Sequence, residues 1–198
     1  MKTKQSIRLF SSPWLERLTR THSLVPVSLF LLYAGALLFA SVQYAGVPIL
    51  TSVSLILLGV LVFTWAEYQI HRRIFHLKPS TPKRAKLQYT IHGVHHELPE
   101  DKSRLAMPPV LSLAIATGLV FLFKWIAGSF SLAFLAGFFT GYAGYLFVHY
   151  LVHAYRAPKN RFKILWRHHH IHHYKDDTCA FGVSSPLWDY IYNTMPKK

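Results

Sequence analysis

The chain has 198 residues, of which 52% are hydrophobic and 15% are charged, and its formal net charge at pH 7 is +14. The apolar content excludes a disordered chain, and the single cysteine, Cys179, excludes a disulfide framework or a cysteine-based zinc cluster. Strong positive charge is typical of nucleic-acid-binding proteins. However, apolar runs of about 20 residues indicate a membrane protein instead, so we expect no nucleic-acid partner.

Four apolar segments are long enough to cross a bilayer. They cover residues 24–45, 47–69, 110–127 and 130–152. Short connections containing Gly46 and Gly128 separate the two members of each pair, which predicts two helical hairpins. The expected fold class is therefore all-α, an integral membrane protein with four transmembrane helices.

Positive charge lies almost entirely on one side of these spans. Every Lys and Arg except Lys124 falls before the first span, between the second and third, or after the fourth. The positive-inside rule therefore predicts that both termini and the central loop are cytoplasmic. We expect an N-terminal segment 1–23, followed by a multi-pass domain 24–198 whose cytoplasmic helical cap comprises 70–109 and 153–198. The membrane would be that of the endoplasmic reticulum in a eukaryote and the inner membrane in a bacterium.

Histidine is unusually frequent: the chain has 13, and all except His22 lie in four clusters on the predicted cytoplasmic side. The clusters are His71/His76, His92/His95/His96, His149/His153 and the run that contains His168, His169, His170, His172 and His173. Residues three and four apart share a helix face, so each His-x2-His-His motif is expected to direct three imidazoles at one point.

The remaining histidine spacings carry separate predictions. His71 and His76 are five residues apart, so the helix is expected to end or distort between them. His168 and His170 point away from the shared face and are predicted, with His22, not to be ligands. The other ten exceed what one metal takes, which favours two metals with about five ligands each. A solvated histidine-rich surface is the alternative, and the repeated spacing argues against it.

Two carboxylates are candidates for orienting these histidines. Glu67 lies in an apolar span, where a carboxylate is costly and usually functional, and it precedes His71 by one turn. We expect it to accept the N–H of a ligand histidine, with pairing to Arg72 or Arg73 as the alternative. Asp189 is expected either to orient a ligand histidine or to pair with an arginine of the cap.

From about Glu67 to Thr194, and most specifically from His92 to Pro109, the sequence resembles the membrane fatty acid hydroxylase superfamily, which is related to the sterol desaturases. Arg104-Leu105 followed by Pro108-Pro109 is similar to the fatty acid or sphingolipid 2-hydroxylase branch, as is the tail from Phe181 to Tyr190. The 15 residues between His76 and His92 separate the chain from carotenoid hydroxylases, whose first two motifs are closer together.

The resemblance implies a dimetal centre that activates O2 and hydroxylates a lipid acyl chain, at C2 in this branch. The implied ligands are His71, His76, His92, His95, His96, His149, His153, His169, His172 and His173. Iron is expected in the active enzyme, with zinc in its place in purified protein. Phe181, Trp188 and Tyr190 are candidates to line the substrate tunnel.

The chain also departs from the family pattern. Leu146 stands three residues before His149, where eukaryotic relatives carry Asp, so the resemblance does not define the polar head of the substrate. The His-Pro-Gly-Gly haem motif of a fused cytochrome b5 domain does not occur in the sequence. We therefore expect a separate electron donor, cytochrome b5-like or ferredoxin-like.

Two alternatives remain. One is a sterol or carotenoid hydroxylase or a desaturase of the same superfamily. The other, from a different class, is a non-enzymatic membrane protein that handles metal. Transport sites usually place ionisable residues near mid-membrane, whereas these histidines lie at one interface, which favours an enzyme.

Overall fold

The computed structural model describes residues 7–197, and within them it contains helices and no strand, which confirms the all-α prediction. Among these residues, four helices are long and apolar enough to cross a membrane. They are α2 (Leu24–Gln43), α3 (Ile49–Ile70), α6 (Pro109–Ala127) and α7 (Phe130–Ala154). The four predicted segments match these helices, with ends displaced by only a few residues. Lys2, Lys4 and Lys198, which count toward the basic segments, lie outside the described residues.

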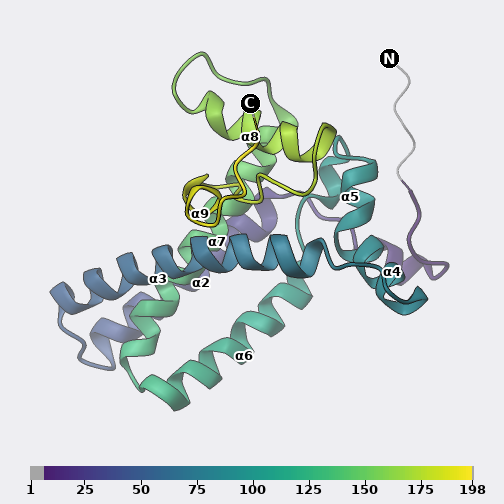
Figure 1. Ribbon diagram of the computed structural model, residues 1–198. Coiled ribbons are helices and arrows are strands. Elements are labelled where there is room, and N and C mark those ends of the chain that lie inside the picture. Colours follow the sequence, from purple (N-terminus) through teal and green to yellow (C-terminus); the bar gives the residue numbers. More distant parts are fainter. Residues whose placement is uncertain (1–6, 198) are drawn as a thin grey trace.

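Short helices gather at one end of the four long ones, where α3 and α7 end and where α2 and α6 begin (Figure 1). They are α1 (Pro13–Leu18), α4 (Pro82–Gln88), α5 (Val94–Glu97), α8 (Lys163–Tyr174) and α9 (Leu187–Ile191). Three tighter or wider turns accompany them: the π-helical η1 (His71–Phe75) and η2 (Tyr89–Gly93), and the 3-10 helix η3 (Lys102–Arg104). We call this end of the molecule the cap end; it comprises α1 from the N-terminal segment together with short helices from the 70–109 and 153–198 segments.

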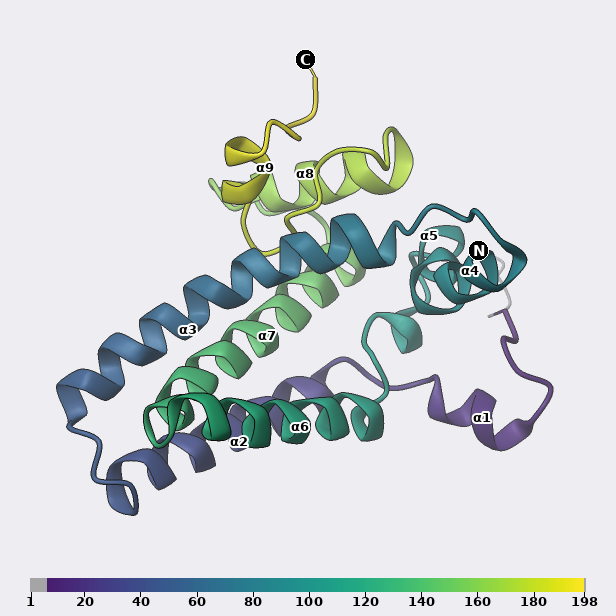
Figure 2. The same ribbon diagram turned by 60° about the horizontal axis from the view of Figure 1, so that its bottom comes forward.

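Helix α7 is central to the packing, because it runs along both α2 and α3 while α6 lies against it over a shorter length (Figure 2). Phe30 of α2 meets Phe139 and Tyr142 of α7 edge to face, with ring centroids 5.6 and 4.7 Å apart. Edge-to-face pairs of this kind add to the gain from burying the rings. The long helices thus form a rigid support for the histidines at their cap end.

Glycine allows α3 and α7 to approach closely. A Cβ atom at Gly59 would lie 2.1 Å from the Phe134 carbonyl oxygen, and one at Gly137 would lie 2.1 Å from the Ile56 carbonyl oxygen. Lipid is as apolar as the helix surface, so the association of membrane helices depends on close van der Waals packing and not on the hydrophobic effect. Small residues permit this close backbone approach. This contact sets the spacing between α3, which leads directly into His71 of η1, and α7, which carries His149.

Substitution of Gly137 tests this close contact. The Gly137→Ala variant is expected to be less stable than the wild type by about 1–3 kcal/mol, because neither backbone can yield without separating α3 from α7. The matched control is Gly144→Ala in the same helix, where a Cβ meets nothing within 4 Å and alanine should be neutral or stabilising. Thermal unfolding in detergent measures both, and equal midpoints for the two variants would contradict the close-contact account.

Candidate metal centre

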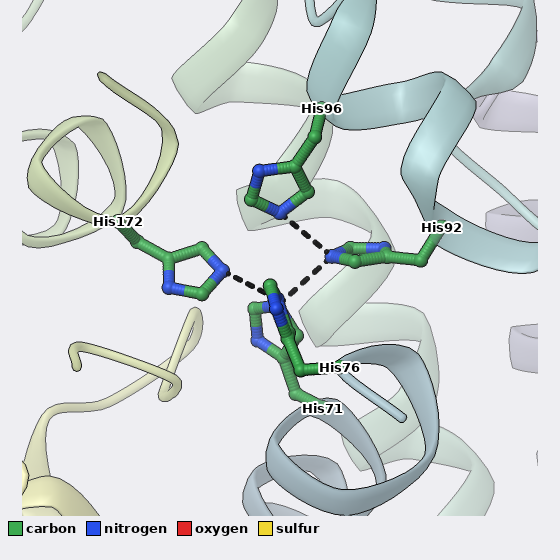
Figure 3. A group of neighbouring side chains, drawn as sticks. All are labelled: His71, His76, His92, His96 and His172. Atoms are coloured by element: carbon green, nitrogen blue, oxygen red, sulfur yellow. Dashed lines mark hydrogen bonds between the residues drawn. The ribbon is translucent and has the colours of Figure 1, made fainter. Parts of the chain in front are cut away.

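The structure brings the ten predicted histidines together in two adjacent groups of five. The first histidine group consists of His71, His76, His92, His96 and His172 (Figure 3). The second histidine group consists of His95, His149, His153, His169 and His173. Within each group, one ring nitrogen per histidine lies within 4.8 Å of the corresponding nitrogens of the others. His22, His168 and His170, which we predicted not to be ligands, belong to neither group.

A π-helical turn brings His71 and His76, which are five residues apart, onto the same side of the helix. The backbone N–H of His76 donates to the His71 carbonyl at 3.2 Å, a bond across five residues that widens the turn. The two rings consequently face each other with centroids 5.2 Å apart. The predicted distortion is confirmed, and π-helical turns of this kind are frequent at functional sites. A second π-helical turn, η2, contains His92 and was not predicted.

The expectation that each His-x2-His-His motif serves one point is wrong. In α8, His169 and His173 enter the second group, whereas His172 enters the first. The motif in the central loop divides in the opposite sense, with His92 and His96 in the first group and His95 in the second. An α-helix turns by about 100° per residue, so the second and third histidines of the motif, which are adjacent in sequence, point in directions about 100° apart. The pair four residues apart therefore stays together and the middle histidine turns toward the neighbouring group.

Ring nitrogens face one another inside the groups. In the first group the Nε2 atoms of His76 and His172 are 2.9 Å apart, and the Nε2 atom of His92 is 3.0 Å from that of His96 (Figure 3). In the second group the Nε2 atoms of His153 and His169 are 2.8 Å apart. A neutral imidazole has a single N–H, so hydrogen bonds alone cannot satisfy so many converging nitrogens.

Backbone carbonyls determine which nitrogen of several rings points inward. The Nδ1 atom of His71 lies 2.5 Å from the Phe181 carbonyl oxygen, and that of His172 lies 2.7 Å from the Cys179 carbonyl oxygen. In the second group, Nδ1 of His149 lies 3.0 Å from the Leu105 carbonyl oxygen. A carbonyl can only accept, so Nδ1 carries the proton in each ring and Nε2 presents a lone pair to its group. Ligand histidines are typically held in this manner.

Burial keeps the imidazoles neutral. It lowers the pKa of His96 to about 4 and that of His172 to about 3, with repulsion from neighbouring rings adding to the effect. Burial likewise places the pKa of His92, His95 and His169 well below the ordinary value. Neutral imidazole is the form that binds a metal, and a set of nitrogen donors suits iron, zinc or copper.

Unpaired buried nitrogens complete the case that these groups fit metal ions. Among the residues described, both ring nitrogens of His173 are buried without a hydrogen-bond partner. A buried polar atom without a partner is costly, and a bound cation would relieve that cost for a nitrogen that faces the group. The donor set, its neutrality and its converging lone pairs all fit one transition-metal ion per group.

Glu67 has a different partner from the one predicted. It accepts hydrogen bonds from the backbone N–H groups of Val183 and Ser184 at 2.7 and 2.9 Å, and from the Ser184 hydroxyl. The tail loop, residues 179–184, lies between this carboxylate and the histidines, so Glu67 contacts the loop and not a histidine ring. The alternative pairing with Arg72 or Arg73 is not what the structure shows either.

Asp189 has no direct contact with a histidine of either group, nor, among the residues described, with an arginine. It is fully buried and accepts a hydrogen bond of 2.9 Å from Nε2 of His168, which is not a member of either group. It accepts two further bonds from the backbone N–H groups of Phe181 and Gly182. Its partners are thus His168, the Thr194 hydroxyl and the same tail loop that Glu67 contacts.

The three aromatic residues predicted to line a tunnel occupy different surroundings. Phe181 is buried beside the first histidine group, with its ring centroid 5.4 Å from that of His172. Trp188 donates from its indole nitrogen to Thr64 at 3.0 Å, and Tyr190 is 75% exposed. A pocket of about 300 Å³ instead lies at the cap end of α3. It is lined by Trp65, Gln69, Ile70, Arg73, Ile74 and Tyr192.

Comparison with known proteins gives consistent results. The sequence model of the fatty acid hydroxylase family matches residues 56–194. Fatty acid 2-hydroxylase of Mus musculus is 35% identical over 98% of this chain and 46% of its own length. Dihydroceramide fatty acyl 2-hydroxylase FAH1 of Arabidopsis thaliana is 30% identical over 98% of this chain and 82% of its own length. The chain therefore spans about half the length of the mouse relative.

A solved structure is similar as well. The structure described as full-length scs7p, with only the hydroxylase domain visible, aligns with a TM-score of 0.84 at 31% identity, and covers 93% of this chain and 70% of that one. The ceramide very long chain fatty acid hydroxylase scs7 of Schizosaccharomyces pombe is 35% identical over 75% of this chain and 44% of its own length. On these matches, the chain belongs to the fatty acid hydroxylase family.

Proposed function

We propose that this protein hydroxylates a lipid acyl chain with O2, at C2 of a fatty acid or of the N-acyl chain of a sphingolipid. The observation that carries the proposal is the pair of five-histidine groups at the cap end of four membrane helices. Relatives named as fatty acid 2-hydroxylases and as dihydroceramide fatty acyl 2-hydroxylases support the position and the substrate class.

The proposed centre contains two iron ions, one in each histidine group. Iron supplies the redox chemistry that insertion of oxygen into an unactivated C–H bond requires, whereas zinc has no redox chemistry. The residues of the chain hold and orient this centre. His71, His149 and His172 direct their Nε2 atoms inward because backbone carbonyls hold their Nδ1 protons.

The chain also controls access to this centre. Phe181 covers the first histidine group on the side of the tail loop, which keeps bulk water from the buried rings. The pocket at the cap end of α3 has apolar walls, with Arg73 and Gln69 at its polar side. We propose that a lipid approaches from the membrane along this face, with its head group at the interface and its acyl chain directed toward the histidines.

Net consumption of two electrons accompanies the reaction: one oxygen atom of O2 enters the C–H bond, and the other leaves as water with two protons. We propose a separate cytochrome b5-like or ferredoxin-like donor. The concentration of Lys and Arg on the cap side supports a cytoplasmic cap and attraction of an acidic partner.

Lipid analysis tests the proposal directly. The chain is expressed in a lipid-rich host under isotopically labelled O2, and acyl chains are compared by tandem mass spectrometry with those of an empty-vector culture. We expect labelled acyl chains whose hydroxyl group maps to C2. A hydroxyl at another carbon, or a new double bond, would contradict the C2 assignment. Metal-loaded protein that forms no oxidised lipid when a donor is co-expressed would favour the metal-handling alternative.

A further inference from the structure

The tail loop, residues 179–184, lies between the first histidine group and two buried carboxylates. On one side, the carbonyls of Cys179 and Phe181 accept the Nδ1 protons of His172 and His71 at 2.7 and 2.5 Å. Both histidines belong to the first group. The orientation of two predicted ligands therefore depends on where this loop places two peptide oxygens.

Asp189 holds the loop from the opposite side. Its Oδ1 atom accepts from the Phe181 N–H at 2.9 Å, and its Oδ2 atom accepts from the Gly182 N–H at 2.7 Å. The Thr194 hydroxyl and the His168 ring complete its contacts at 2.7 and 2.9 Å. A carboxylate that is 0% exposed and bonded on both oxygens is fixed in place.

Glu67 holds the next two residues of the loop. Its Oε1 atom accepts both backbone N–H groups, those of Val183 and Ser184, while Oε2 accepts from the Ser184 hydroxyl. Glu67 is 6% exposed and lies one turn before His71 on α3. The two carboxylates thus anchor four successive peptide N–H groups, 181–184, to a rigid helix and to α9.

A single peptide unit connects Asp189 to His71. The peptide between Phe181 and Gly182 donates its N–H to Asp189 and accepts the His71 proton at its carbonyl. Hydrogen bonds in such a chain polarise one another, so the carboxylate strengthens the carbonyl as an acceptor. Ala180, whose φ is +58°, turns the backbone between the two carbonyls that face the histidines.

We propose that Glu67 and Asp189 are positioning residues that act through the backbone of the tail loop and hold His71 and His172 as Nε2 ligands in the first histidine group. The inference rests on the metal centre of the proposed function. In place of direct carboxylate–histidine contact, which is one common arrangement around ligand histidines, it puts a peptide between the two groups. It predicts that the first group, and not the second, depends on these carboxylates.

Amide substitution distinguishes this proposal from a requirement for charge or for packing. In Asp189→Asn, an NH2 group replaces one of the two oxygens that each accept a backbone N–H. A backbone N–H can only donate, so it would face another donor and its hydrogen bond would be lost. In Glu67→Gln, the remaining carbonyl oxygen still accepts both N–H groups, and the new NH2 meets a serine hydroxyl, which can accept. We therefore expect the glutamine to be tolerated and the asparagine not to be.

Metal content and release measure the effect. Purified wild-type protein and Glu67→Gln are expected to carry about two metals per chain, whereas Asp189→Asn and Glu67→Ala should retain about one, in the second group. Release to a chelator from the affected group should be faster by roughly 10- to 100-fold. The matched control is Glu97→Gln, an exposed carboxylate next to His96 in sequence whose partner is the Tyr89 hydroxyl. It should behave as wild type.

The possible results separate cleanly. Wild-type metal content and release in Asp189→Asn, or equal loss from both groups, would overturn the inference, as would a Glu67→Gln variant as defective as Asp189→Asn. A variant that keeps the metal of the second group is still folded. If Asp189→Asn fails to fold, the comparison of Glu67→Ala with Glu67→Gln gives the same test. Wild-type protein with two metals and no hydroxylated lipid would overturn the proposed function and leave this inference standing.

Discussion

Joint replacement of His172 and His173 by alanine is expected to abolish hydroxylated product, a loss of at least about 100-fold, because it removes one ligand from each histidine group at once. Adjacent residues on α8 belong to opposite groups, as do His95 and His96, so two neighbouring substitutions reach both groups. The measurement is the amount of hydroxy acyl chain per expressed protein, with metal content determined on the same preparation.

The matched control for the double variant is His170→Ala. His170 lies in the same run of α8 but is exposed and belongs to neither group. We expect it to form product at the wild-type level. Comparable loss in His170→Ala would indicate that the run acts as a histidine-rich surface, and full activity of the double variant would remove both histidines from the proposed ligand set.

Exchange of the metal is the second change with a large expected effect. Protein stripped by a chelator should form no product, refilling with ferrous iron should restore it, and refilling with zinc should not, because zinc has no redox chemistry. Both metals should raise the thermal unfolding midpoint, since a ligand present at about 100 times its Kd stabilises the folded state by about 2.7 kcal/mol. The melting curves thus separate binding from chemistry.

Controls for the metal exchange use the same protein. The His172→Ala, His173→Ala variant refilled with iron should remain inactive, which excludes activity of free iron in the lipid mixture. Zinc-refilled protein that is as active as the iron-refilled protein, with iron absent by elemental analysis, would contradict a di-iron centre.

The spans and the histidine clusters were predictable because each is a property of neighbouring residues. Length and apolar content located α2, α3, α6 and α7, and the spacing of His71 and His76 predicted a distorted turn that the structure shows as η1. The division of each His-x2-His-His motif between the two groups was not predicted. The signal was available, because adjacent residues of an α-helix point about 100° apart and the last two histidines of each motif are adjacent.

The partners of the carboxylates were not predictable in the same way. Glu67 and Val183 are 116 residues apart, and no periodic pattern in the tail loop indicates which backbone groups face inward. The carbonyls of Cys179, Phe181 and Leu105, which hold the histidine protons, carry no side-chain signature at all. Hydrogen bonding by the backbone depends on tertiary placement, which local sequence patterns do not encode.

The mixed origin of the two histidine groups has a consequence for biosynthesis. Each group draws a member from α8, near the end of the described chain, so neither is complete until the ribosome has passed residue 173. The four long helices, in contrast, are all made by residue 154 and can enter the bilayer earlier. A complete five-histidine group therefore forms only after all four long helices have been synthesised.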